Sequence, residues 1–287
     1  MRPLSVLMAA LALLSASAAS SRGAVTIVAA ENFYGDVARQ IGGPDVAVTS
    51  ILNNPGRDPH LFEASPSVAR AVSAARIVIC NGLGYDPWAE KLLQATQRTD
   101  RKTLVVAALA GRRAGDNPHI WYDPATMVAL AGALAADLGG VDPAHRSDYR
   151  RRFARFRQSI EPLEARIAAL RRRLSGVPAA ATEPVFGYML AALGMPVRNP
   201  RFQLAVMNGT EPGASDIANF EHDLATHQVR LLVYNSQASD PTAERMVKLA
   251  EAAHIPVVAV SETEPPGEDY QAWIASELDA VARALPG

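Results

Sequence analysis

The first half of the chain alternates between short apolar runs and segments whose apolar residues recur every three or four positions. Short runs are typical of strands, and the longer spacing is typical of helices, as Phe33, Val37 and Ile41 illustrate. The pattern predicts strands at 25–28, 46–52, 76–80 and 104–107 and helices at 32–41, 66–75 and 86–94. Strands that alternate with helices indicate βαβ units and a mainly parallel sheet.

The pattern changes near Asp142. After the initial Asp142-Pro143 pair, the chain up to Leu174 contains no glycine and one proline, Pro162, and its apolar residues keep helical spacing. We expect a single helix that begins at the Asp-Pro pair and ends at Ser175-Gly176. At 1.5 Å per residue it would be about 45–50 Å long, enough to span a protein of two lobes.

Beyond Gly176 the alternation resumes. Strands are predicted at 177–181, 230–234 and 255–260, and helices at 184–193, 214–227, 241–253 and 269–285. The fold class predicted is therefore α/β, with two βα lobes of mainly parallel sheet joined by one long rigid helix. The expected division is an N-terminal lobe over 20–141, the linker helix over 142–175 and a C-terminal lobe over 176–287.

The start of the chain is typical of a secretory signal peptide. Arg2 precedes an apolar run from Leu4 to Leu14, and small residues follow up to Ala19. We expect residues 1–19 to be a signal peptide and the protein to be exported to the periplasm. No later stretch has the roughly 18 uninterrupted apolar residues of a spanning helix, so a soluble mature chain is expected. The single cysteine, Cys80, leaves no acceptor for a lipid beside the signal peptide.

Charge argues against a nucleic-acid partner. The chain has 28 basic and 29 acidic residues and a net charge of -1, whereas nucleic-acid binders usually carry a basic excess. Two arginine runs, 150–152 and 171–173, lie in the predicted long helix. With a neutral total charge, we interpret them as the solvated face of that helix.

Candidate chemistry lies in four segments where a predicted strand gives way to a helix. Ligands of open α/β sheets bind beyond the carboxyl ends of the strands. His60 and His119 each follow a proline in the first two segments, and Glu183 and Glu262 provide carboxylates in the other two. Imidazole nitrogen combined with carboxylate oxygen suits zinc, manganese or iron(II). The sequence therefore predicts one metal site assembled from both lobes.

These segments resemble the metal-binding solute receptors of bacterial ABC importers for zinc, manganese and iron, also called the cluster A-I or TroA-like family. The Pro-His-x-x-Glu and Pro-His-x-Trp motifs, in this order before a long helix, are the most specific features. The segments that carry the resemblance are 58–63, 81–88, 117–124, 186–188 and 211–215. It implies a two-lobe protein, expected as a monomer, that carries one divalent ion, zinc or manganese, to a membrane permease.

The resemblance also implies the ligands. His60 and His119 match the two histidine ligands of the N-terminal lobe, and Glu183 matches a third position that is His or Glu in the family. The fourth ligand of the family is an Asp, and Glu262 falls almost at its place, with Glu264 and Ser261 as alternatives. The chain departs from the family at Asn235 and Ser236, where a Glu is common, and in residues 111–116, which replace an acidic His-rich loop.

Two other function classes remain open from the sequence. A secreted metallohydrolase would need a metal with an open coordination position and a nearby general base. The chain contains no His-Glu-x-x-His motif or comparable compact signature. An adhesin or structural surface protein would be expected to show repeats or a surface anchor, and the sequence shows neither. We therefore expect a binding protein rather than an enzyme.

Overall fold

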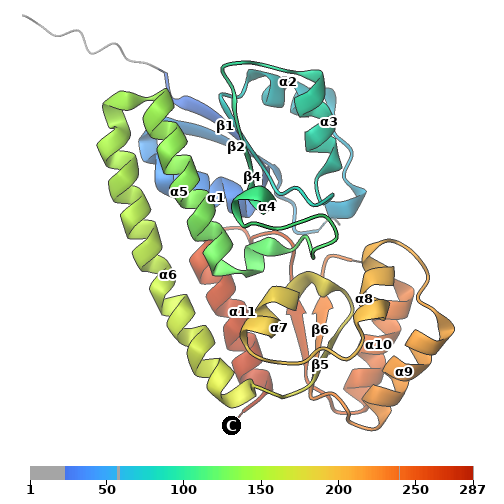
Figure 1. Ribbon diagram of the computed structural model, residues 1–287. Coiled ribbons are helices and arrows are strands. Elements are labelled where there is room, and N and C mark those ends of the chain that lie inside the picture. The colour runs from blue at the N-terminus through green and yellow to red at the C-terminus, as the bar shows by residue number, and fades with distance from the viewer. Residues whose placement is uncertain (1–22, 57–58, 239, 287) are drawn as a thin grey trace, which may run out of the picture.

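The computed structural model describes residues 23–56, 59–238 and 240–286. They form two lobes, one above the other in Figure 1, and each lobe is built on its own parallel sheet. The expected α/β class with two parallel sheets is confirmed. The predicted signal peptide, residues 1–19, lies outside the described residues.

The sheet of the N-terminal lobe has the order β2-β1-β3-β4. Its strands are β1 (Val25–Glu31), β2 (Val46–Leu52), β3 (Ile77–Cys80) and β4 (Lys102–Val105). Alternate residues of β1 point to opposite faces. Ile27 packs with α1 (Asn32–Gly42) and α5 (Pro124–Val141), whereas Val28 packs with α2 (Pro66–Ala74) and α3 (Pro87–Ala95). Both faces are therefore covered, as expected for a parallel sheet.

The sheet of the C-terminal lobe has the order β5-β6-β7. Its strands are β5 (Ala179–Ala181), β6 (Leu231–Asn235) and β7 (Val257–Val260). One face packs against α7 (Gly187–Ala192) and α11 (Tyr270–Ala284), and the other against α8 (Pro200–Met207), α9 (Ala214–Ala225) and α10 (Pro241–Ala252). Strand ends of the two sheets approach each other where the lobes meet.

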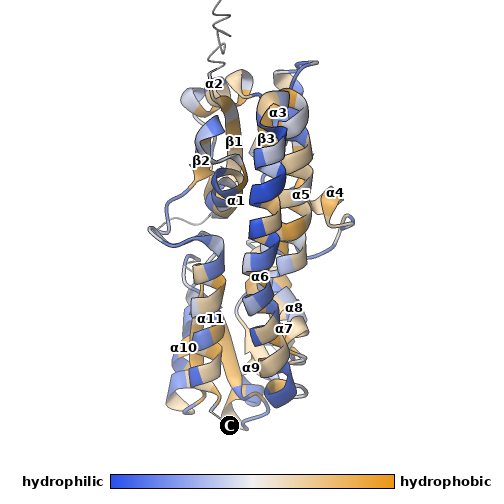
Figure 2. Cartoon of the chain, turned by 90° about the vertical axis from the view of Figure 1, so that its left-hand side faces the viewer, coloured by the Kyte–Doolittle hydropathy of each residue, from blue (hydrophilic) through white to orange (hydrophobic). Residues whose placement is uncertain are grey.

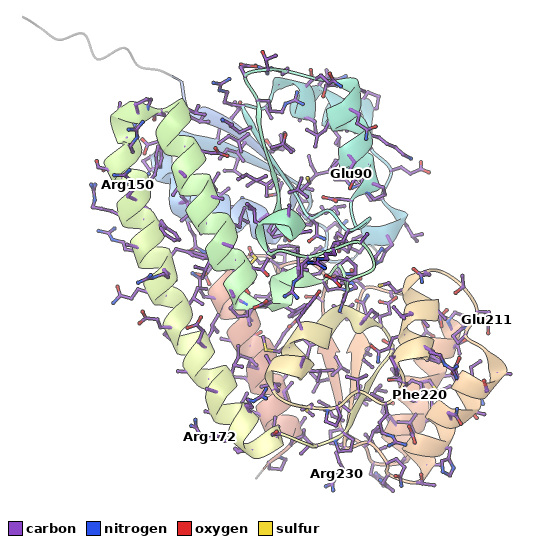
Figure 3. The ribbon with its side chains drawn as sticks, viewed as in Figure 1. Glu90, Arg150, Arg172, Glu211, Phe220 and Arg230 are labelled. Carbon is purple, nitrogen blue, oxygen red and sulfur yellow. The ribbon has the colours of Figure 1, made fainter. Side chains whose placement is uncertain are left out.

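The long helix α6 (Arg146–Leu174) runs along both lobes on one side of the molecule (Figure 1). Its 29 residues give a length of about 44 Å. Phe156, Ile160 and Leu163 are among its buried residues, and its outer face is hydrophilic (Figure 2). Arg150 and Arg172 point outward near opposite ends (Figure 3), in agreement with a solvated arginine face.

Helix α6 begins four residues later than predicted. Asp142 ends α5, and a 3₁₀ turn over Pro143–His145 separates the two helices. The Asp142 carboxylate accepts hydrogen bonds from His145 Nδ1 at 2.6 Å and from the Tyr149 hydroxyl at 2.8 Å, which fixes this turn. The division into 20–141, 142–175 and 176–287 remains our proposal for the domain boundaries.

Within the described part of the chain, three α-helices were not predicted: α4 (Val106–Leu109), α5 and α8. The predicted strand at 104–107 is β4, which ends at Val105 and continues into α4. Among the described residues, α5 is long and apolar enough to cross a membrane. It nevertheless packs against α1 and α6 and buries Met127, Leu130 and Leu134, as a core helix of a globular lobe does.

Polar contacts of α1 join the two lobes. Asn32 at the start of α1 donates from Nδ2 to the Glu264 carbonyl at 2.7 Å and accepts from the Glu264 N–H at 3.0 Å. Further along α1, Gln40 and Gln271 exchange two side-chain hydrogen bonds at 2.9 and 3.0 Å. These bonds place the loop after β7 directly against the N-terminal lobe.

Candidate metal site

Two imidazoles of the N-terminal lobe and one carboxylate of the C-terminal lobe converge between the sheets. Glu262 Oε2 lies 3.2 Å from His119 Nε2 and 3.4 Å from His60 Nε2. One ligand atom from each residue falls within 4.8 Å of the others. His119 and Glu262 are fully buried, and the side chain of His60 is 26% exposed. The sequence therefore predicted three residues that the structure brings together.

Asn117 fixes the orientation of His119. Its Oδ1 accepts from the His119 backbone N–H at 3.1 Å and lies 2.6 Å from His119 Nδ1, while its Nδ2 donates to the Pro184 carbonyl at 2.6 Å. Because Nδ2 is the donor to Pro184, Oδ1 must be the acceptor, and Nδ1 carries the imidazole proton. The lone pair of Nε2 then points at Glu262. Outer hydrogen bonds of this kind are typical of metal-binding histidines.

A glycine permits this contact between the lobes. A Cβ at Gly187 would lie 2.9 Å from Asn117 Nδ2, which is too close for an ordinary side-chain contact. The next residue, Tyr188, donates from its hydroxyl to the Asn117 carbonyl at 2.8 Å. The segment after β5 therefore holds Asn117, and through it the ring of His119.

Tyr85 is a site residue whose role the sequence did not reveal. Its hydroxyl donates to Glu262 Oε2 at 3.0 Å across the lobe interface. The turn before it is fixed by the Asp86 carboxylate, which accepts from the Asn81 and Gly82 N–H groups at 2.6 and 2.9 Å. Gly82 has a φ of 80°, which favours glycine. The sequence signals were the glycine-containing turn before an Asp-Pro pair and the place of Tyr85 within the segment 81–88 that carries the resemblance.

Glu262 is held at both its backbone and its carboxylate. Gln237 Oε1 accepts from the Glu262 N–H at 2.6 Å and from the Thr263 N–H at 2.9 Å. Asn235 Nδ2 donates to Glu262 Oε1 at 2.6 Å. The other carboxylate oxygen, Oε2, is thereby directed towards Tyr85 and the imidazoles.

The charges of the site favour a cation. Burial alone would raise the pKa of Glu262, but when His119 and His60 are protonated, their hydrogen bonds and positive charges outweigh burial and hold this pKa well below its ordinary value. Burial lowers the pKa of His119, although Glu262 opposes this change. An ionised carboxylate and a neutral imidazole lone pair at 3.2 Å repel each other unless a proton or a cation lies between them. A divalent transition metal satisfies both groups.

The other candidate ligands, Glu183, Glu264 and Ser261, have different contacts. Glu183 is 5% exposed and accepts at Oε2 from Asn235 Nδ2 at 2.5 Å, so one amide joins it to Glu262. It lies outside the group of three converging ligand atoms. Glu264 is also outside that group. Burial, with a contribution from the charge of Asp36 on α1, raises the pKa of Glu264 to about 9. Ser261 faces Tyr122, whose hydroxyl donates to its carbonyl at 2.7 Å.

Metal affinity should fall on acidification, because protons and the ion compete for the same imidazole lone pairs. Burial lowers the pKa of His119, so protonation of this ring requires a pH below the ordinary value of about 6.5. We expect apparent zinc affinity to change little from pH 8 to 7 and to decrease towards pH 5. Competition titration with a chelator of known pH dependence measures this, and equal affinity at pH 7 and 5 would argue against histidine ligation.

Comparisons with known proteins identify the family. The family described as "Zinc-uptake complex component A periplasmic" matches residues 27–284. The metal ABC transporter substrate-binding lipoprotein SloC of Streptococcus mutans is 25% identical, over 91% of this chain and 90% of that protein. The iron-binding protein YfeA of Yersinia pestis is also 25% identical, over 87% of this chain and 83% of its own length.

Solved structures confirm the fold. The periplasmic zinc-binding protein TroA of Treponema pallidum superimposes with a TM-score of 0.77 at 18% identity, over 91% of this chain and 99% of TroA. FpvC of Pseudomonas aeruginosa, solved with Mn²⁺, gives a TM-score of 0.75 at 19% identity, over 92% and 98% of the two chains. The family match covers nearly the whole described chain, including both lobes, α6 and the converging residues. The chain therefore belongs to the ZnuA/TroA family of metal-binding solute receptors of ABC importers, which are binding proteins and not enzymes.

Proposed function

We propose that this receptor captures one divalent transition-metal ion, zinc or manganese, between its lobes in the periplasm. It then delivers the ion, as a monomer, to the membrane permease of its ABC importer. The observation that carries this proposal is the convergence of His60 Nε2, His119 Nε2 and a Glu262 carboxylate oxygen within 4.8 Å. The ion is cargo, so the site must bind it firmly and also release it.

The proposed ligands are His60, His119, Glu183 and Glu262. The first two and the last converge directly, and Glu183 is joined to Glu262 through Asn235. Two neutral imidazoles with two carboxylates would balance the charge of a divalent ion. This donor set suits zinc, manganese and iron(II) and is too poor in sulfur for copper(I) or an iron–sulfur cluster.

Similar proteins support a divalent transition metal as the cargo. The similar proteins include receptors described as binding manganese, iron or zinc, such as the manganese-binding lipoprotein MntA of Bacillus subtilis. A carboxylate at position 183 makes the site harder than an imidazole would, which improves the relative binding of manganese. Intrinsic affinity nevertheless rises from manganese to zinc along the divalent series. We therefore expect the purified protein to bind zinc more tightly.

Export fits this role. The proposed signal peptide over 1–19 would bring the chain to the compartment in which an importer collects its cargo. The arrangement of two lobes around a buried ion lets movement of either lobe expose the ion. A permease that contacts both lobes could therefore promote its release.

Native mass spectrometry tests the proposal on protein purified from its own periplasm without added metal. The expected species is a monomer with one bound ion, which elemental analysis identifies as zinc or manganese. Treatment with a chelator should remove this mass, and addition of one equivalent of zinc should restore it. A metal-free protein that also fails to take up zinc or manganese would contradict the proposal.

A further inference from the structure

Asn235 holds both candidate carboxylates with one amide nitrogen. It ends β6 and is 4% exposed, and its Nδ2 donates to Glu183 Oε2 at 2.5 Å and to Glu262 Oε1 at 2.6 Å. An amide NH₂ group has two hydrogens, so these two bonds use its full donor capacity. The amide adds no charge of its own between the two carboxylates.

The orientation of this amide is fixed by its other contacts. Asn235 Oδ1 accepts from the Gln237 backbone N–H at 3.0 Å, and the Asn235 backbone N–H donates to Thr182 Oγ1 at 3.2 Å. A flipped amide would lose the Gln237 bond and would place an oxygen against two carboxylates. The two donor bonds are therefore a property of the folded C-terminal lobe.

The bond from Asn235 restricts how Glu262 can bind an ion. Oε2 of Glu262 faces His60 and His119, whereas Oε1 is held by Asn235. Binding through both oxygens requires the carboxylate to turn until both face the ion, and this rotation would break the bond at 2.6 Å. Glu183 is restricted in the same way, because its Oε2 is also held. Each carboxylate can then contribute one oxygen without loss of a buried hydrogen bond.

This restriction determines the coordination number. Two imidazole nitrogens and two single carboxylate oxygens make four donors, the number that zinc prefers in proteins. Manganese favours a larger set rich in oxygen, which carboxylates can supply by binding through both oxygens. Breaking a bond between a buried amide and a charged carboxylate to gain such a donor has a cost, because the amide hydrogen is left without a partner.

We propose that Asn235 is a specificity-determining residue that limits Glu183 and Glu262 to one oxygen each and so favours a four-coordinate ion, zinc, over manganese. The proposal rests on the ligand set proposed above. It assigns a function to a neutral residue that is not among the proposed ligands.

Cobalt(II) reports the coordination number directly, because four-coordinate cobalt absorbs visible light much more strongly than five- or six-coordinate cobalt. The cobalt-loaded wild type should show the strong bands. Asn235→Leu has nearly the same size and no donor, and Asn235→Asp keeps the acceptor for Gln237 but removes the NH₂ group. Both variants should lose most of the visible intensity. Their preference for zinc over manganese, from competition titration, should narrow by about 10-fold, within the range typical of outer-shell partners.

Gln203→Leu is the matched control. Gln203 is 4% exposed in the same lobe, and its amide donates to Asn199 Oδ1 at 2.9 Å without contact to the site. This variant removes a buried amide and should keep the wild-type cobalt spectrum. Circular dichroism before loading shows whether each variant is folded, so that loss of structure is not mistaken for a change in coordination.

The outcomes separate the two proposals. A wild type that binds neither cobalt nor zinc contradicts the proposed function. A wild type that binds cobalt with weak bands contradicts the role of Asn235, even if neither Asn235 variant folds. Folded Asn235 variants with an unchanged spectrum and an unchanged metal preference also overturn that role, while the receptor function stands.

Discussion

His119→Ala should weaken zinc binding by more than about 100-fold, since loss of an outer-shell partner alone costs 10- to 100-fold. His119 is fully buried, and its Nε2 lies 3.2 Å from Glu262 Oε2. Alanine leaves no donor there, and Asn117 Oδ1 loses its hydrogen bond from Nδ1. The remaining three donors would have to complete the coordination with water in a closed site. Isothermal titration calorimetry with zinc, in competition with a chelator, measures the change.

His222→Ala is the control for this measurement. His222 is an exposed residue of α9 in the C-terminal lobe and is not part of the site. We expect this variant to bind zinc as the wild type does, with one ion per chain. His60→Ala should also weaken binding, although the partly exposed position of His60 gives water easier access to replace its nitrogen. Wild-type affinity in a folded His119→Ala protein would remove His119 from the site.

The fold could be predicted in segments where hydrophobic residues recur with a clear period. The strands β1, β2 and β3, the long helix α6 and the alternation of the C-terminal lobe followed from this spacing. Helix α5 did not, because its segment is rich in Ala, Gly and Leu on all sides and lacks a polar face that would reveal a helical period. Helix α5 is also buried between α1 and α6. Such a segment can be recognised only once its neighbours are known.

The site was predictable to the extent that its residues have distinctive chemistry. His60, His119 and Glu262 stood in strand-end segments with metal-binding donors, and the structure brings them together. Tyr85 and Asn117 are neutral residues in loops, and their roles depend on contacts with the other lobe. No spacing along the chain encodes such contacts. In the sequence, Asn235 was singled out only as a departure from the family. Its hydrogen bonds to Glu183 and Glu262 could be seen only in the structure.

The second large loss of zinc affinity is expected for a substitution of Glu262, the residue that we favour over Glu264 as the fourth ligand. Glu262→Gln removes the charge that faces both imidazoles and replaces one carboxylate oxygen by an NH₂ group. An amide is a weaker ligand for a divalent ion, and its NH₂ group cannot accept the bonds from Tyr85 or Asn235. We expect zinc affinity to fall by more than about 100-fold, beyond the range for an outer-shell partner.

Glu264→Gln should leave zinc affinity close to that of the wild type. Burial, reinforced by the charge of Asp36, raises the pKa of Glu264 to about 9, so the side chain is neutral near pH 7 and glutamine resembles it closely. The same competition titration compares the two variants. If Glu264→Gln lost more affinity than Glu262→Gln, the carboxylate ligand would have to be reassigned to Glu264.

Glu264→Gln should instead change the pH dependence of stability. The ordinary pKa of a glutamate is about 4.3. Between that pH and about 9, Glu264 is ionised in the unfolded chain but protonated in the folded one. The folded state therefore binds more protons, and the free energy of unfolding decreases as pH rises through this window. Glutamine cannot ionise, so this contribution should vanish in the variant. Glu277, whose pKa burial raises to about 8, should preserve part of the decrease. Urea unfolding at pH 5, 7 and 9 measures the slope, and an equal slope in wild type and variant would show that Glu264 is ionised in the folded protein.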